Sequence, residues 1–478
     1  MEVLTSDNGL AETEADAFAL ALFEGDDLPA ELASAPGAAT AKGRAQKTAT
    51  VHADFGPVIV VGAGKREELV PERLRVAAAL ALREATRLEA KALAWEVPEG
   101  PDREALAAAI VTGTALASYR FDRFRTRDED ESRPELERLT LAGPDSLVGA
   151  AETARVVAEA QNRARELQNL PANVATPAFL AARAEEIAAA SDSVSAEILG
   201  PAEIAEREMG GLVAVSRGSD VEARLIVLRY QGGGAGERLG LVGKAVTFDT
   251  GGISLKPAQG MHEMKMDMSG GAAVLEAVAA IAELGLPLDL VAVVPATENT
   301  PSGHSTKPGD IITQYNGKTV EVNNTDAEGR LILGDALSYC TELGAERIVD
   351  LATLTGAVLI ALGSTYAALI SNDDDFAAEV GAAAETTGEL AWRLPLHAEY
   401  KELTKGTVAD LTNAASKRKA GTIYAGSFLE EFVDGKPWVH LDIAGTSWDV
   451  GRAYVGKGAT GFGVRLLVEL ATRLSAEE

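Results

Sequence analysis

Four acidic residues stand where glycine-rich and apolar sequence otherwise predicts burial: Asp249, Asp267, Asp326 and Glu328. They lie in two segments, 242–268 and 323–331. Carboxylates that converge cannot all stay ionised without compensating cations. Two divalent metals satisfy that requirement, and metals about 3.5 to 4 Å apart can deprotonate a bridging water and polarise a carbonyl. The chemistry that these residues predict is hydrolysis.

The types of these residues narrow the choice of metal. An oxygen-rich set with little imidazole favours Mg, Mn or carboxylate-bound Zn over a soft-metal site. The alternative is that the acids form surface salt bridges or helix caps. A carboxylate cluster beside Gly251-Gly252 and lysines in apolar sequence has few structural uses, however. By contrast, Asp373 to Asp375 and Glu402 are predicted to be caps or solvated residues.

Other chemistries lack their sequence signals. A phosphate-binding loop at 62–66 would need glycine where Ile59 stands and Ser or Thr where Arg66 stands, and Glu67 replaces the third glycine of a dinucleotide-binding turn. No two of the five histidines have the spacing of an H-E-x-x-H zinc site, and no G-x-S-x-G elbow occurs. The expected nucleophile is therefore water.

Alternating strand-like and helix-like runs must position the acidic residues. Strands are predicted at 225–230, 239–246, 288–294, 319–322 and 348–351, and helices at 272–284 and 330–343. This alternation predicts a mixed α/β sheet. Asp249 and Lys256 flank a glycine turn at the end of a strand, where open α/β sheets place their ligands. Asp326 and Glu328 follow another strand, and residues two apart in extended chain point the same way.

The length of the chain predicts two domains, because 478 residues exceed the roughly 250 to 300 at which single cores stop growing. The expected fold class is α/β. We predict a smaller N-terminal α/β domain at 1–146, a linking helix at 147–170, and a catalytic domain with a mixed sheet flanked by helices at 171–478. Within the first domain we expect a strand at 58–61, helices at 71–93 and 103–107, and an exposed acidic loop at 128–131.

Composition excludes several classes of protein. The net charge of −28 repels phosphate backbones and anionic membranes, so nucleic acid is not expected as a partner. The one cysteine, Cys340, is predicted to lie in the core. The N-terminus lacks a basic region before an apolar stretch, which predicts a cytoplasmic protein. The uncharged run 351–372 is interpreted as a buried, turn-containing element and not as a membrane span.

These motifs resemble those of the leucine aminopeptidase (cytosol aminopeptidase) family. Its signature N-T-D-A-E-G-R-L stands intact as residues 324–331. The resemblance extends through F-D-T-G-G-I-S-L-K-P from Phe248, E-N-T-P-S-G from Glu298, D-L-A-T-L-T-G-A from Asp350 and H-L-D-I-A-G-T from His440. It covers most of residues 165–478, whereas the N-terminal third resembles the family only loosely.

The resemblance implies a role for each matching residue. Asp249 and Glu328 would bridge two metals, Mn²⁺ or Zn²⁺ with Mg²⁺ as an alternative. Asp326 would complete one site, and Lys244 and Asp267 the other, with the lysine neutral.

The same resemblance implies that Lys256 stabilises the gem-diolate. Arg330 would hold a bicarbonate ion that moves the proton from the bridging water to the leaving amine. Asp267 and a metal would bind the free α-amine of the peptide substrate.

The family resemblance also implies a substrate pocket and an assembly. Met264, Thr353, Leu354 and Gly356 match positions that line the pocket for the first side chain, which would favour Leu and other apolar residues. The family forms a homohexamer, a dimer of trimers. Ala245 departs from the glycine that is usual after the metal-binding lysine.

Two rival functions use other readings of the same sequence. The carboxylates could serve another two-metal hydrolase, such as a phosphatase, which would cleave phosphoesters and not peptides. The chain could also have a non-enzymatic, nucleic-acid-binding or scaffold role, against which its negative charge argues.

Overall fold

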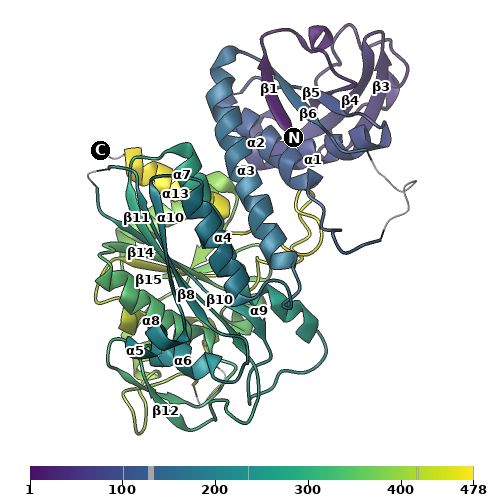
Figure 1. Ribbon diagram of the computed structural model, residues 1–478. Coiled ribbons are helices and arrows are strands. Elements are labelled where there is room, and N and C mark those ends of the chain that lie inside the picture. Colours follow the sequence, from purple (N-terminus) through teal and green to yellow (C-terminus); the bar gives the residue numbers. More distant parts are fainter. Residues whose placement is uncertain (101, 127–133, 235, 416, 418, 477–478) are drawn as a thin grey trace. The chain divides into compact units, whose positions relative to one another are not determined.

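The computed structural model describes residues 1–100, 102–126, 134–234, 236–415, 417 and 419–476, which form two compact units. Unit 1 comprises Met1–Asn162 and Gly451–Gly456, and unit 2 comprises Arg163–Val450 and Lys457–Glu478 (Figure 1). The division falls within the helix α3 (Val148–Asn169). The domain boundaries at 146 and 170 remain a prediction.

Unit 1 is built on a six-stranded sheet with the order β1-β6-β5-β2-β4-β3, parallel except for β3 at its edge. The strands are β1 (Glu2–Ser6), β2 (Ala17–Phe23), β3 (Thr48–Ala53), β4 (Gly56–Gly64), β5 (Ala92–Glu96) and β6 (Arg138–Ala142). Side chains alternate along β4, so that Ile59 joins the core under the helices while Val58 and Val60 pack with Leu32 in a second cluster.

The helices of unit 1 are α1 (Pro71–Arg87), α2 (Arg103–Ser118) and the first part of α3. The predicted helix at 71–93 is too long, because Glu89 has φ +58° and residues 92–93 begin β5, which pairs between β2 and β6. The predicted helix at 103–107 is too short, since α2 continues to Ser118. The acidic loop predicted at 128–131 lies outside the described residues.

Unit 2 is built on a nine-stranded mixed sheet with the order β16-β15-β18-β14-β9-β11-β8-β7, and β10 also pairs with β11. The strands are β7 (Val194–Leu199), β8 (Arg224–Gln231), β9 (Leu239–Gly243), β10 (Ala245–Asp249), β11 (Asp289–Asn299), β14 (Arg347–Ala352), β15 (Ala367–Ser371), β16 (Ala391–Arg393) and β18 (Trp438–Asp442). The five strands β18, β14, β9, β11 and β10 are parallel to one another, so their carboxyl ends share one edge, whereas β15 and β8 run antiparallel on either side.

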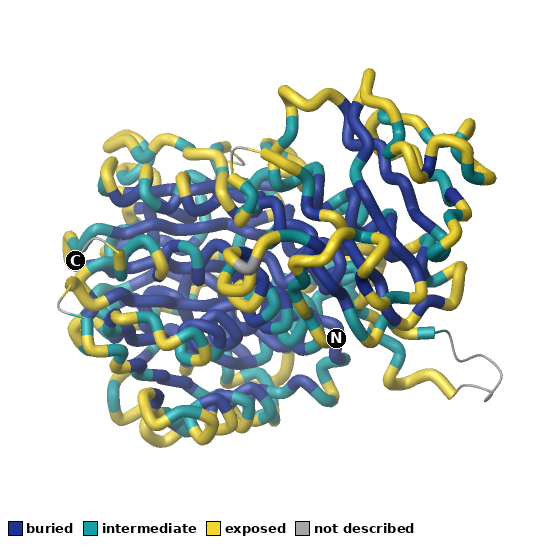
Figure 2. The backbone as a smooth tube through the Cα atoms, turned by 90° about the horizontal axis from the view of Figure 1, so that it is seen from above, coloured by how far each residue is buried: buried dark blue, intermediate teal, exposed yellow. Residues whose placement is uncertain are grey.

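Helices cover both faces of this sheet (Figure 1). One layer contains α4 (Pro177–Ala189), α7 (Ser269–Leu284), α10 (Asp374–Thr387) and α13 (Val464–Ala476), and the other contains α6 (Gly210–Ser216), α8 (Gly329–Glu342) and α12 (Gly421–Leu429). The strands between them are buried along most of their length (Figure 2). Cys340 of α8 is fully buried, as predicted. The predicted α/β fold class is confirmed.

Smaller elements complete unit 2. A three-stranded sheet contains β12 (Asp310–Thr313), β13 (Thr319–Val322) and β17 (Leu411–Thr412). Short helices are α5 (Pro201–Glu206), η6 (Met261–Met268), α9 (Gly356–Leu362), α11 (Ala398–Glu402) and η7 (Glu430–Phe432).

The uncharged run 351–372 forms the end of β14, then α9 and β15. Its strands are buried, but Ile360 of α9 is 91% exposed, so the expectation of a buried element holds only for the strands. Among the described residues, no helix is both long and apolar enough to cross a membrane.

Candidate metal centre

Polar and acidic residues lie at the carboxyl ends of the parallel strands. Asp249 ends β10, Asn299 ends β11, Asp442 ends β18, and Thr353 follows directly after β14. Because these strands are parallel, the residues that end them lie along the same edge of the sheet, as predicted for the ligands of an open α/β sheet.

Lys244 interrupts what the sequence predicts as one strand at 239–246. Its backbone N–H donates to Leu351 and its carbonyl accepts from Gly271, so the chain breaks into β9 and β10 at this residue. The side chain is buried, and its Nζ lies 2.7 Å from Asp267, 2.8 Å from Glu328 and 2.9 Å from the Thr353 carbonyl. The interruption of the strand thus turns a lysine inward among carboxylates.

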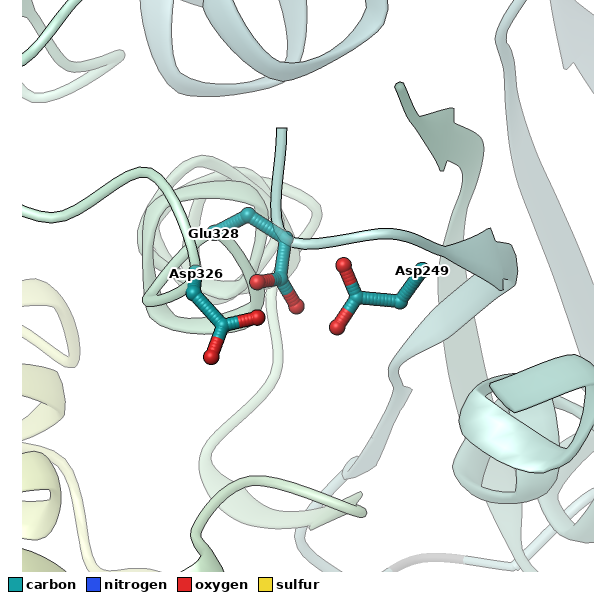
Figure 3. A group of neighbouring side chains, drawn as sticks. All are labelled: Asp249, Asp326 and Glu328. Atoms are coloured by element: carbon teal, nitrogen blue, oxygen red, sulfur yellow. The ribbon is translucent and has the colours of Figure 1, made fainter. Parts of the chain in front are cut away.

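Asp249, Asp326 and Glu328 form a carboxylate cluster. One oxygen atom from each side chain lies within 4.8 Å of the others, and Figure 3 shows the three groups facing one another. Asp249 and Glu328 are buried, whereas Asp326 is partly exposed. The sequence predicts this convergence correctly but for the wrong reason. Asp326 lies in a turn and Glu328 has helical dihedral angles, so the chain is not extended between them.

Glycines allow the charged groups to approach this closely. A Cβ atom on Gly251 would lie 2.8 Å from Oδ1 of Asp326, and Gly251 has φ +86°. A Cβ atom on Gly329 would lie 2.8 Å from Nζ of Lys244. Any larger residue at either position would fill the space between the charged groups, which explains why both glycines accompany the acidic residues.

Lys256 contacts two of the acidic side chains that Lys244 does not pair with. The turn after β10 closes with the bond from the backbone N–H of Lys256 to the Thr250 carbonyl, 2.9 Å long. Nζ of Lys256 lies 2.7 Å from Asp249 and also contacts Asp326. The four acidic side chains therefore meet two ammonium groups.

Burial and charge oppose each other at these groups. Burial raises the pKa of Asp267 to about 8 and that of Asp249 to about 6. Burial alone would lower the pKa of Lys244 and Lys256, but the attraction of the surrounding carboxylates is larger and raises both. The attraction of the acidic groups therefore keeps both lysines charged, and four carboxyl groups surround the two ammonium groups.

The donor set fits divalent cations. Carboxylate oxygens with one amine suit hard and borderline ions such as Mg, Mn and Zn. The close approach that Gly251 and Gly329 permit keeps the donors adjacent. A neutral Lys244, which a metal ligand must be, would require bound cations to reverse the raised pKa of this ammonium.

Arg330 lies in the first turn of α8 beside the cluster. Its guanidinium is buried, donates from Nη1 to the Asn413 carbonyl at 2.9 Å, and lies 5.4 Å from the centre of the Tyr424 ring. Burial lowers the pKa of this arginine. Among the described residues, its buried Nε has no hydrogen-bond partner. The site therefore contains a desolvated cation with an unused donor.

The four predicted pocket residues come from two segments. Met264 is partly buried on η6, the same short helix as Asp267. The Thr353 hydroxyl donates to Asp267 at 2.6 Å, and the Leu354 N–H donates to Asp442 at 3.2 Å. Gly356 is exposed at the start of α9. Thr353 thus contacts Asp267 directly, whereas Met264 shares η6 with Asp267, and Leu354 and Gly356 follow Thr353 in the chain.

Three further residues support the site and were not predicted from the sequence: Asn299, Asn413 and Asp442. Nδ2 of Asn299 donates to Asp249 at 2.8 Å and to the Thr325 carbonyl at 3.0 Å. Asn299 belongs to the family-like motif that begins at Glu298, which could have identified it. Asp442 likewise belongs to the family-like motif that begins at His440. The side chain of Asn413 bonds backbone groups, and no residue spacing reveals such contacts.

Comparisons with known proteins agree along the whole chain. A family model described as "Cytosol aminopeptidase family, catalytic domain" matches residues 162–468, and one for the N-terminal domain of the same family matches residues 8–128. A probable cytosol aminopeptidase of Roseiflexus castenholzii is 44% identical, covering 98% of each chain. One of Alkaliphilus metalliredigens is 44% identical over 90% of this chain and 88% of its own.

Solved structures show the same likeness. The bottromycin maturation enzyme BotP in complex with Mn is 34% identical with a TM-score of 0.89, covering 97% of this chain and all of its own. A mutant of tomato leucine aminopeptidase is 33% identical with a TM-score of 0.89, covering 99% of this chain and 96% of its own. Both likenesses include unit 1, and the match of the family's N-terminal model to residues 8–128 shows that the N-terminal third resembles the family more closely than its motifs predict.

Proposed function

The chain belongs to the cytosol aminopeptidase family, and we propose that it releases Leu and other apolar residues from the N-terminus of peptides in the cytoplasm. The family is metal-dependent, and the chain is a hydrolytic exopeptidase. The observation that carries the proposal is the buried cluster of Asp249, Asp326 and Glu328 beside two lysines.

The carboxylate set supports two metal positions. Asp249 and Glu328 would be shared between them, Asp326 would complete one, and Lys244 with Asp267 the other. Mn²⁺ and Zn²⁺ suit these donors, with Mg²⁺ as an alternative. When bound, the ions would lower the pKa of a shared water and polarise the scissile carbonyl.

The cationic residues have separate roles in this proposal. Lys256, which is partly exposed beside Asp249, would face the oxyanion that develops when the carbonyl is attacked. Arg330 would hold a bicarbonate ion, which would supply a proton carrier for the leaving amine. Its buried Nε, unpartnered among the described residues, is a donor suited to an anion.

Substrate selection would combine charge and apolar contact. Asp267 is positioned by Lys244 and the Thr353 hydroxyl, and its carboxylate would attract the free α-amine of a peptide. Met264, Thr353, Leu354 and Gly356 would line the pocket for the first side chain. We extend the proposal to a homohexamer, a dimer of trimers, as the assembly of this chain.

Release of p-nitroaniline from leucine-p-nitroanilide tests the proposal. The chelated protein is assayed before and after addition of Mn²⁺, Zn²⁺ or Mg²⁺, next to Asp326→Ala and Glu328→Ala. We expect activity restored by metal in the wild type, lost in both variants, and absent with an N-acetylated substrate. Asp374→Ala, which removes an exposed acid paired with Arg393, should keep full activity. Phosphoester cleavage without peptide cleavage would favour a different two-metal hydrolase.

A further inference from the structure

Asn413 encloses the turn that carries two of the acidic residues. The strand β17 pairs with β13 and brings this residue beside the turn, where it is fully buried. Its Oδ1 accepts the backbone N–H of Asn323 at 2.9 Å and that of Asn324 at 3.2 Å. Its Nδ2 donates to the carbonyl of Asn324 at 2.7 Å and to that of Ala327 at 3.3 Å.

These four bonds fix the backbone on both sides of Asp326. Ala327 separates Asp326 from Glu328, so a carbonyl held at Ala327 restricts the direction of both carboxylates. The side chain of Asn413 uses both donors and its acceptor oxygen in these contacts. An aspartate would offer no donor and an alanine neither donor nor acceptor.

The main chain of Asn413 holds a third component of the site. Its carbonyl oxygen accepts the hydrogen bond from Nη1 of Arg330 at 2.9 Å. One buried residue therefore contacts the backbone on both sides of Asp326 and the guanidinium of Arg330. These groups lie more than 80 positions away from it in the sequence.

We propose that Asn413 is a positioning residue that sets the spacing of Asp326 and Glu328 and thereby the affinity of the site for divalent metal. This inference rests on the proposed function, in which the two carboxylates bind metal. Residues that orient metal ligands typically change metal affinity or activity by about 10- to 100-fold when they are replaced.

The test is calorimetric titration of chelated wild type, Asn413→Ala and Asn413→Asp with Mn²⁺, together with kcat and KM. We expect Mn²⁺ affinity about 10- to 100-fold weaker in both variants and a fall in kcat that exceeds the change in KM. Asn413→Asp keeps the volume and the two accepted bonds, so it carries the test if Asn413→Ala does not fold.

The matched control is Asn372→Ala. Asn372 also holds backbone groups, donating to the Lys436 carbonyl and accepting from the Trp438 N–H, each at 2.9 Å, at the opposite end of β18 from Asp442. The Asn372→Ala variant should be less stable than the wild type but should bind Mn²⁺ with the same affinity. Wild-type affinity for Mn²⁺ in both Asn413 variants would overturn this proposal alone. A wild type that binds no Mn²⁺ would overturn the proposed metal centre as well.

Discussion

Nζ of Lys244 lies 2.8 Å from Oε1 of Glu328, and each side chain is only 3% exposed. This contact joins the break between β9 and β10 to the start of α8. Because water cannot reach either group, each charge is compensated by its protein neighbours. Removal of either partner from the metal-free protein would therefore leave the other charge buried and uncompensated.

Lys244→Met should destabilise the metal-free protein by about 3 to 5 kcal/mol, because it leaves Asp267 and Glu328 buried without their cation. Urea unfolding of the chelated protein measures this, and metal content after dialysis should fall. Lys405→Met removes an exposed lysine that pairs with Glu402 and should change stability by less than about 1 kcal/mol. Equal unfolding midpoints for the two variants would contradict the role of the buried contact.

Lys256→Ala should lower kcat by about 10²- to 10³-fold with little change in KM, because stabilisation of a developing oxyanion acts on the transition state. Steady-state kinetics on leucine-p-nitroanilide measures both constants. Lys307→Ala, which removes a largely exposed ammonium, is the matched control. A raised KM with unchanged kcat would assign Lys256 to ground-state binding instead.

Asp442→Asn should raise KM more than it lowers kcat. The Asp442 carboxylate accepts the Leu354 N–H at 3.2 Å and the Thr355 hydroxyl at 2.6 Å, so it shapes the loop of the proposed pocket. An amide cannot accept at both positions. The control is Asp373→Asn, which changes a helix cap where Asn serves as well as Asp. This variant should leave KM and kcat unchanged. If the Asp442→Asn variant has the same KM as the wild type, Asp442 has no role in substrate binding.

Asp335 should make unit 2 less stable as the pH rises. Burial raises its pKa to about 7, despite the backbone N–H groups of Leu212 and Tyr315 that it accepts. The folded state therefore holds a proton that the unfolded state releases near its usual pKa of about 4. The stabilisation is fully present below the unfolded pKa and is lost progressively as the pH rises through about 7.

The measurement is urea unfolding at pH 5.5 and pH 8.5 for wild type and Asp335→Asn. We expect the variant to be less stable at both pH values by about 1 to 3 kcal/mol, since an amide must place a donor against a backbone N–H. Its loss of stability between the two pH values should be smaller than that of the wild type. An identical loss in both proteins would show that another group titrates.

Cys340 should not react with a thiol reagent in the folded protein. The side chain is fully buried, and burial raises the pKa of the thiol to about 12, so the reactive thiolate is scarce. Absorbance after addition of dithiobis(nitrobenzoate) should report no free thiol until denaturant is added. Rapid labelling of the native protein would contradict the burial of α8.

The amino-acid sequence by itself determined which residues are capable of chemistry. Acidic residues in glycine-rich, apolar surroundings are costly to bury. Such residues at positions 249, 326 and 328 therefore already indicated a functional cluster of carboxylates. Apolar runs located the central strands β8, β11 and β14 and the helices α7 and α8 of unit 2, because these strands are buried and apolar along most of their length. Periodicity failed at residues 92–93, where pairing between two strands outweighs local helix preference.

Only the tertiary structure decided how these residues meet. The break at Lys244 depends on a bond to β14, and the turn at Asp326 depends on bonds from Asn413, both of which join distant parts of the chain. Backbone hydrogen bonds carry no side-chain signature, so a residue such as Asn413 cannot be identified from spacing. The local sequence pattern indicates which residues are buried and which are charged. The geometry of the site depends on contacts between distant segments, which form only when the sheet is assembled.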